Sequence, residues 1–250
     1  DFIAIPQLLT KVPEDFIWAA AVCQDRGYTE VNLNIGCPSG TVVSKGKGSG
    51  MLRELSHLDR FLDRIFQDCA LPISIKTRLA LEDPEDFPRL LDIYNQYPIQ
   101  ELTIHPRVRS DFYQGSVREE WFRYAFLNSK NPLCYNGDLH DLADIQAVQD
   151  RYPGLEAVML GRGLIGDPGM FLPQGTTAEV LEAFMDALLQ EYTVAFGGSR
   201  NAMFRLKENW GFLHHRFPGS EKLWKQLLKT TDVSQYKAIT AEIFRNYPIK

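Results

Sequence analysis

Short aliphatic runs alternate with amphipathic segments along the first two thirds of the chain, and this rhythm constrains the fold more than any other feature. The runs cover residues 3–8, 31–38, 72–78, 101–105, 132–138 and 157–163, about 30 residues apart. Helical periodicity fills the intervals between them. Strands that alternate with helices at this spacing predict parallel βαβ units and an α/β fold.

Each predicted strand carries a polar or reactive residue at or near its C-terminal end. These residues are Gln7, Cys37, Lys76, His105, Asn136 and Arg162. In a doubly wound sheet the functional strand ends meet at one crevice, whereas a TIM (β/α)8 barrel uses them all the way round, so the pattern favours the barrel. Because a closed barrel needs eight strands, we expect two further βα units, roughly 50–70 residues, before Asp1.

The chain changes character after Pro168, where no further strand pattern occurs. Helical periodicity covers residues 176–196, 199–217, 223–228 and 235–247. We therefore expect an N-terminally incomplete barrel domain over residues 1–174 and an all-helical domain over residues 175–250.

Cations lie among aromatic residues in the predicted helical domain. The set is Arg200, Arg205, Lys207, His214, His215 and Arg216. It is either a solvated helix face or, together with Lys45, Lys47, Arg107 and Arg109 of the barrel domain, the lining of a nucleic-acid groove. The net charge of −5 argues against binding nucleic acid through bulk electrostatics, but it leaves room for a local basic groove.

The cysteine pattern and the hydropathy exclude other classes of protein. The four cysteines show no CxxC spacing and no histidine partners at zinc spacing, so we expect no metal site and a reducing, cytoplasmic environment. No apolar run approaches the roughly 20 residues that a membrane helix needs. The N-terminus, Asp1-Phe2-Ile3, shows no signal peptide.

Cys37 lies between Gly36 and Pro38 at the end of a predicted strand, where the chain has to turn. Residues 39–50 then form a glycine-rich, cationic segment that we expect to be a mobile loop. A lone cysteine is most often a packed thiol. Its position at a strand end favours instead a proton donor or a nucleophile.

Lys76 ends an aliphatic strand, where a charge needs a partner. That partner is either a carboxylate, such as Asp138 or Glu30, or an electron-rich cofactor ring. His105 is either an ordinary barrel histidine or a hydrogen-bond partner of the cofactor or substrate. Residues 136–138 and 161–163 are either simple glycine turns or two walls of a phosphate site.

Five ordered motifs together resemble the tRNA-dihydrouridine synthases, which are FMN enzymes that reduce a uridine in tRNA. The motifs are Asn34-Ile35-Gly36-Cys37-Pro38, Ile75-Lys76-Thr77-Arg78, Leu102-Thr103-Ile104-His105-Pro106-Arg107, Asn136-Gly137-Asp138 and Met159-Leu160-Gly161-Arg162-Gly163. The resemblance covers nearly the whole chain. It implies an FMN-binding barrel, a C-terminal helical domain, and tRNA held across both.

The resemblance also implies roles for individual residues. Gln7, Lys76 and His105 would surround the flavin ring, and Cys37 would be the general acid. The ribityl phosphate would be held by Asn136, Gly137, Asp138, Gly161 and Arg162. The substrate would contact Asn34, Arg107, Arg109, Lys45, Lys47, Arg205 and Lys207. NADPH would be the reductant, and the protein would be a cytoplasmic monomer.

Two details refine this expectation. The stretch Arg205-Leu206-Lys207-Glu208-Asn209-Trp210 looks like the C-type bacterial subgroup, which modifies uridine 16 in the D-loop. The family's first strand supplies a Pro-Met type segment under the flavin, and no such segment occurs before Gln7. This agrees with the two missing units and predicts weak or absent flavin binding by this chain.

Two rival functions remain open. A dihydroorotate-dehydrogenase type FMN barrel would act on a free pyrimidine and would need neither a helical appendage nor a basic groove. A tRNA-binding protein that has lost its flavin would bind tRNA without catalysis.

Overall fold

A parallel sheet of six strands organises the first part of the chain. Its strands are β1 (Gln7–Leu8), β2 (Val31–Ile35), β3 (Ile73–Arg78), β4 (Leu102–His105), β5 (Leu133–Asn136) and β6 (Ala157–Met159). They pair in sequential order, each parallel to the next. This confirms the predicted α/β fold and is the order of consecutive strands in a (β/α)8 barrel. The two further βα units stay a prediction.

The computed structural model describes residues 2–250 and divides them into two compact units. The sheet unit comprises the residues up to Asp138 together with Val148–Met159. The helical unit comprises Leu139–Ala147 and Leu160–Lys250. The division therefore differs from the predicted boundary at residues 174 and 175, because residues 139–147 and 160–174 group with the helices.

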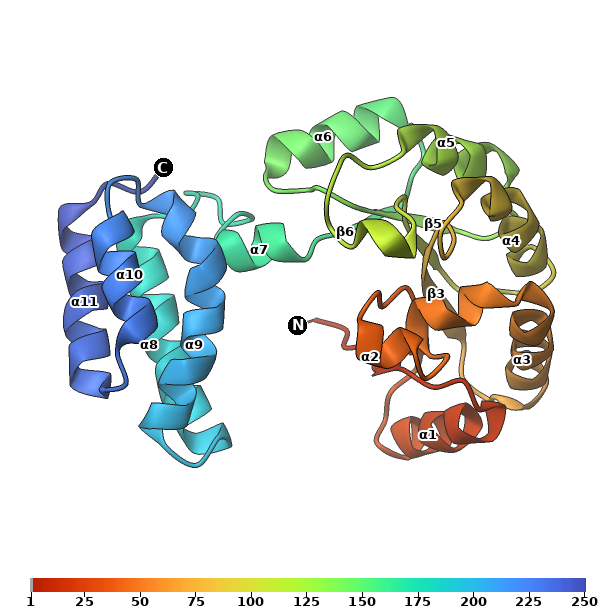
Figure 1. Cartoon of the computed structure of the whole chain (residues 1–250), viewed down its shortest axis with the longest axis horizontal. Helices are drawn as coiled ribbons and strands as arrows, with labels where there is room; N and C mark the ends of the chain where they lie inside the picture. Colours follow the sequence, from red (N-terminus) through yellow and green to blue (C-terminus); the bar gives the residue numbers. More distant parts are fainter. Residues whose placement is uncertain (1) are drawn as a thin grey trace. The chain divides into compact units, whose positions relative to one another are not determined.

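Helices follow the strands along the chain (Figure 1). They are α1 (Pro13–Asp25), α3 (Leu55–Asp68), α4 (Phe87–Tyr94), α5 (Glu119–Asn128) and α6 (Leu142–Arg151). Shorter turns are α2 (Gly40–Val43), η1 (Gly48–Arg53), η2 (Pro84–Asp86) and η3 (Arg109–Asp111). In α3 the buried residues Leu58, Phe61, Leu62 and Ile65 recur at helical spacing, so this helix packs one apolar face into the core.

The strand register separates an aliphatic face of the sheet from a polar face. Leu33 pairs with Ile75, Ile75 with Leu102, and Leu102 with Leu133, and all four side chains are buried. One residue along, Asn34 pairs with Lys76 and Lys76 with Thr103. Because side chains alternate between the two faces of a strand, the register gathers the polar residues on one face.

Two predictions about local structure are wrong. The predicted strand at residues 3–8 is reduced to Gln7–Leu8, and Phe2 and Ile3 are exposed. Residues 39–50 do not form an irregular loop, because α2 and the start of η1 lie within them. Residues 48–52 of η1 are buried.

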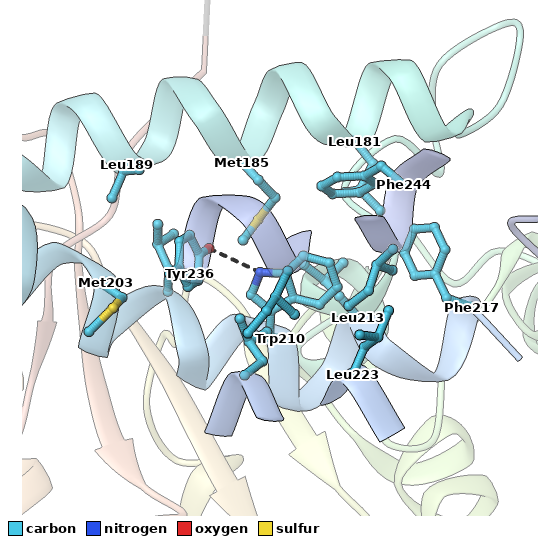
Figure 2. Packing of buried hydrophobic residues seen from close by; sticks show 14 of the residues in the cluster. Leu181, Met185, Leu189, Met203, Trp210, Leu213, Phe217, Leu223, Tyr236 and Phe244 are labelled. Carbon is cyan, nitrogen blue, oxygen red and sulfur yellow. Dashed lines mark hydrogen bonds between the residues drawn. The ribbon is translucent and has the colours of Figure 1, made fainter. Parts of the chain in front are cut away.

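The helical unit contains α7 (Arg162–Gly166), α8 (Ala178–Ala195), α9 (Ser199–Leu213), η4 (His214–Arg216), α10 (Glu221–Lys229) and α11 (Val233–Asn246). Its core surrounds the fully buried Trp210, with Met185 and Phe244 among the contacting residues (Figure 2). The indole Nε1 of Trp210 donates a hydrogen bond to the hydroxyl of Tyr236 at 3.0 Å. This confirms the prediction of an all-helical structure after residue 175.

No helix within residues 2–250 is both long enough and apolar enough to cross a membrane.

Candidate active site

A chain of side-chain amides crosses the polar face from β1 to β3. Asn34 Nδ2 donates to Gln7 Oε1 at 2.7 Å, Gln7 Nε2 to Asn32 Oδ1 at 2.8 Å, and Asn32 Nδ2 to Ser74 Oγ at 3.0 Å. Asn34 Oδ1 accepts from backbone N–H groups, which can only donate, and this fixes the orientation of every amide in the chain. The exposed Gln7 side chain is therefore held in one orientation.

Cys37 lies half-buried in the turn that follows β2. Asn34 Oδ1 accepts hydrogen bonds from the N–H groups of Gly36 at 3.1 Å and of Cys37 at 2.9 Å. Asn34 thus caps the turn that carries the thiol. With both acceptor positions and one N–H in use, Asn34 has only one N–H left for the substrate contact that the resemblance implies.

The ammonium group of Lys76, in β3, lies in surroundings that disfavour its positive charge. Burial, and then the neighbouring Arg78 charge, lower the pKa of Lys76 to about 8. Across residues 2–250, Lys76 forms no ion pair with any carboxylate, so the predicted alternative of a salt bridge to Asp138 or Glu30 is wrong. An ammonium group on the polar face without a carboxylate partner fits an anionic or electron-rich ligand.

His105 and Arg107 are buried at the end of β4 and contact the half-buried Asp138, which follows β5. Arg107 donates to both carboxylate oxygens of Asp138, at 2.9 and 2.6 Å. Arg107 Nη1 lies 3.2 Å from His105 Nε2. Because a guanidinium only donates, His105 Nε2 accepts and the ring proton lies on Nδ1. The His105 side chain lies on the polar face, two residues beyond Thr103.

Two predicted site roles need correction in this cluster. Arg107 is 1% exposed, and it also donates to the carbonyls of Gln114 and Gly115, so it holds its own loop rather than reaching substrate. Asp138 was predicted to bind the flavin phosphate. Its carboxylate instead neutralises Arg107, and a carboxylate would repel a phosphate.

The other predicted flavin-site residues fall into two groups. Asn136 is half-buried and donates from Nδ2 to the Met159 carbonyl at 2.8 Å. Gly137 has φ +151°, and a Cβ there would lie 2.8 Å from Val117 Cγ1, so only glycine fits. Gly161 and Arg162 are exposed at the start of α7 in the helical unit. Their role in holding a phosphate stays a prediction.

The predicted substrate cations differ in their surroundings. Lys45 is exposed and Lys47 is half-buried. Arg109 lies with its guanidinium carbon 5.2 Å from the centre of the Phe112 ring, and its buried Nε has no hydrogen-bond partner within the described residues. Arg205 is exposed and pairs with Glu208 at 3.1 Å. These four remain candidates for contact with an anionic substrate.

Lys207 was predicted to contact tRNA, and the structure contradicts this. Its side chain is buried, and Nζ donates to the carbonyls of Leu228 and Thr230 at the end of α10. Burial lowers its pKa. A cation at this position satisfies the free carbonyls of a helix C-terminus, so Lys207 ties α9 to α10.

Several residues near Cys37 were missed by the sequence analysis. Asn32 and Ser74 continue the amide chain, and Ser49 and Arg78 bind the Cys37 turn. Arg78 follows Lys76 by two residues, so the strand period could have placed it on the same face. Ser49 had no comparable signal, because its segment was expected to be a loop.

No group of three or more His, Cys, Asp or Glu side chains in residues 2–250 is placed to hold a metal ion.

Comparison with known proteins gives matches along most of the chain. The chain is 28% identical over 235 residues to a tRNA-dihydrouridine(16) synthase of Vibrio cholerae, covering 91% of this chain and 72% of the relative. It is 30% identical over 166 residues to tRNA-dihydrouridine synthase B of Proteus vulgaris, covering 66% and 51%. A probable tRNA-dihydrouridine synthase of Rickettsia bellii is 28% identical over 198 residues, covering 76% and 60%.

The match spans about half to three fifths of some relatives, with 60% for the Rickettsia bellii protein and 50% for that of Rickettsia prowazekii. A solved structure of a morphinone reductase mutant with tetrahydroNAD matches 63% of this chain and 46% of the reductase chain. The two are 17% identical and the TM-score is 0.46, a likeness too slight to define the fold. The family model described as "Dihydrouridine synthase (Dus)" matches residues 3–241. Because that model covers nearly all of this chain, the chain belongs to the dihydrouridine synthase family.

Proposed function

We propose that this chain is the catalytic part of a flavin-dependent tRNA-dihydrouridine synthase, which reduces a uridine of the tRNA D-loop to 5,6-dihydrouridine. One observation carries the proposal: the turn that holds the Cys37 thiol follows β2, beside a polar sheet face that holds the unpaired Lys76. Family membership supports the reaction. The name of the Vibrio cholerae relative, matched over 91% of the chain, supports uridine 16 as the target.

The residues of the sheet unit fit a flavin on two observations. Lys76 has a charge without a carboxylate partner, and Gln7 presents an exposed amide in a fixed orientation. When bound, FMN would supply the hydride for the reduction, with NADPH as its source. Lys76 would stabilise negative charge on the reduced ring, while Gln7 and His105 would offer it hydrogen bonds.

The chain's own part in the reaction is a proton transfer. A uridine inside the tRNA stack is out of reach, so the target base has to flip out toward the polar face. The Cys37 thiol would then give its proton to C5 of the uracil, while C6 receives the hydride from the other side of the ring. Hydride and proton together saturate the C5–C6 bond.

The substrate would be held by cations outside the buried clusters. Lys45, Lys47 and Arg109 of the sheet unit and Arg205 of the helical unit are the remaining candidates for contacts with tRNA phosphates. We further propose that the protein acts in the cytoplasm as a monomer.

The test compares Cys37→Ala with Cys23→Ala, since Cys23 is a half-buried cysteine of α1 and serves as a matched control. We expect Cys37→Ala to lower dihydrouridine formation in unmodified tRNA about 100-fold or more, the usual contribution of a general acid, and Cys23→Ala to leave it unchanged. Flavin absorbance of both variants shows whether the cofactor is still bound. Equal activity of Cys37→Ala and wild type, or turnover of dihydroorotate without tRNA, would contradict the proposal.

A further inference from the structure

Every backbone polar group of Gly36 and Cys37 has a hydrogen-bond partner. The two N–H groups donate to Asn34 Oδ1. The Gly36 carbonyl accepts from Arg78 Nε at 3.0 Å. The Cys37 carbonyl accepts from the N–H of Ser49 at 3.1 Å and from its hydroxyl at 2.8 Å. Three side chains from β2, β3 and η1 therefore fix the backbone that carries the thiol.

The segment that supplies Ser49 packs directly on Cys37. A Cβ at Gly48, which has φ +55°, would lie 2.9 Å from the Cys37 Cβ. A Cβ at Gly50 would lie 2.8 Å from the Val43 carbonyl oxygen. Only residues without a side chain allow this approach, so glycines bring Ser49 within reach of the Cys37 carbonyl. What remains free at Cys37 is the rotation about χ1.

Arg78 links the Cys37 turn to a second loop. Its guanidinium is buried, and it also donates to the carbonyls of Val108 at 2.9 Å and of Phe112. Burial lowers the pKa of Arg78. No carboxylate pairs with it directly among the described residues, so carbonyl groups carry most of the compensation for its charge. Phe112, which Arg78 holds, has the unusual φ of 52° for a residue other than glycine.

We propose that Ser49 and Arg78 are positioning residues for the Cys37 thiol, and that Arg78 couples the Cys37 turn to residues 108–112. The catalytic meaning of this coupling rests on the proposed acid role of Cys37. Through Arg78, a ligand that moves the loop carrying Arg109 and Phe112 also moves the thiol.

The test for Ser49 uses alkylation of Cys37 by iodoacetamide, read by mass spectrometry, with Cys23 in the same molecule as the internal control. We expect Ser49→Ala to free the turn and raise the Cys37 alkylation rate about tenfold, while the Cys23 rate stays the same. Turnover of tRNA should fall in kcat with little change in KM. An unchanged alkylation rate in a folded Ser49→Ala protein would overturn the role of Ser49.

The test for Arg78 uses hydrogen exchange, which needs neither flavin nor tRNA. Arg78→Lys keeps a charge but loses the fork that reaches three carbonyls, so protection should fall together at residues 36–37 and 108–112. Loss at only one of the two segments would overturn the coupling. If Cys37→Ala proved fully active while these effects appeared, the proposed acid role would fail and the positioning would stand.

A separate pocket of about 390 Å³ lies in the sheet unit, between the start of α1, η1 and the start of α3. Three cationic side chains line it, Lys11, Arg53 and Arg60, together with the imidazole of His57. The single carboxylate in its lining, Glu54, is bonded to His57 Nδ1 at 3.0 Å. No ion pair or side-chain hydrogen bond within residues 2–250 involves Lys11, Arg53 or Arg60.

The pocket combines this charge with an apolar floor that includes Met51, Leu58 and Phe61. Two of its lining segments, at Lys11 and at residues 46–51, come after β1 and β2 in the chain, and Gly48 in the second segment packs against Cys37. We infer that it binds a phosphate of the tRNA backbone away from the reacting uridine, an inference that rests on tRNA being the substrate.

The test measures tRNA binding at several salt concentrations with the Cys37→Ala protein and without NADPH, so that no turnover occurs. Replacing Arg53 and Arg60 together by Gln should weaken binding and reduce the slope of log affinity against log salt by about 1 to 2. The control is Arg26→Gln, an exposed arginine at the other end of α1. An unchanged slope would overturn the pocket's role. Absence of tRNA binding in both the parent and the control would contradict the proposed function itself.

Discussion

At the scale of single residues, burial of the Lys76 charge makes the free energy of unfolding depend on pH. Its pKa is lowered from 10.5 to about 8. Below pH 8 the folded protein carries the charge at full cost. Between pH 8 and 10.5 the unfolded chain binds a proton that the folded protein does not, so the free energy of unfolding rises with pH. Above pH 10.5 Lys76 is neutral in both the folded and the unfolded state, so the cost of burying its charge has disappeared.

Lys76→Met should therefore stabilise the protein at pH 7 by on the order of 3 kcal/mol, since each pKa unit corresponds to about 1.4 kcal/mol. The gain over wild type should shrink as the pH rises from 8 to 10.5. Urea denaturation at several pH values measures this, and the exposed Lys45→Met is the control. A stability difference that does not change with pH would contradict the burial of an unpaired charge.

Residue types singled out candidate site residues, but they did not show which groups those side chains contact. Cys37, Gln7 and Lys76 stood out because a reactive or polar residue ends an aliphatic strand. Arg107 and Lys207 stood out equally, yet the structure buries both on carbonyl groups. A sequence displays a cation, but it does not display the free carbonyls of a loop or helix end that the cation satisfies.

At the scale of secondary-structure elements, α11 begins with a cap that can be tested. Asp232 accepts a hydrogen bond from the N–H of Gln235 at 2.8 Å. Asp232→Ala leaves that N–H without its partner and should destabilise the protein by about 1 kcal/mol, whereas Asp232→Asn keeps an acceptor and most of the stability. Thermal unfolding followed by circular dichroism compares the two. A melting temperature of Asp232→Ala equal to that of wild type would show that the cap contributes nothing.

Aliphatic runs located the six strands, because a buried parallel strand needs them. Residue composition was less reliable for the ends of the elements and for the segments between them. Residues 3–6 read as a strand but are not part of the sheet. Residues 39–50 read as a loop because of their glycines, which in the structure permit the close packing of η1. Glycine content alone does not distinguish a flexible segment from one that packs too tightly for a side chain.

At the scale of the whole molecule, each of the two units has a core of its own. The aliphatic face of the sheet and the helices that follow its strands bury the sheet unit's core. In the helical unit, the cluster around Trp210 draws on α8, α9, α10 and α11 (Figure 2). The sequence predicted this two-part organisation from the loss of the strand pattern after Pro168. It did not predict that residues 139–147 group with the helices, because that grouping depends on contacts rather than on composition.

Because the two cores are separate, a destabilising substitution in one unit should lower the stability of that unit alone. Tyr236→Phe removes the acceptor of the Trp210 indole N–H, which is fully buried, so the helical unit should lose about 1–3 kcal/mol. Tyr192→Phe is the control, because its hydroxyl forms no hydrogen bond within the described residues and it packs against the same cluster.

Hydrogen exchange resolves the effect by segment. Protection should fall in α9 and α11 and remain unchanged in β2, β3 and β4, because local opening follows the stability of the unit that contains the amide. Equal loss of protection in both units would mean that they unfold together, and that the sheet unit depends on the helical unit for its stability. Loss confined to the helical unit would establish that its core folds on its own contacts.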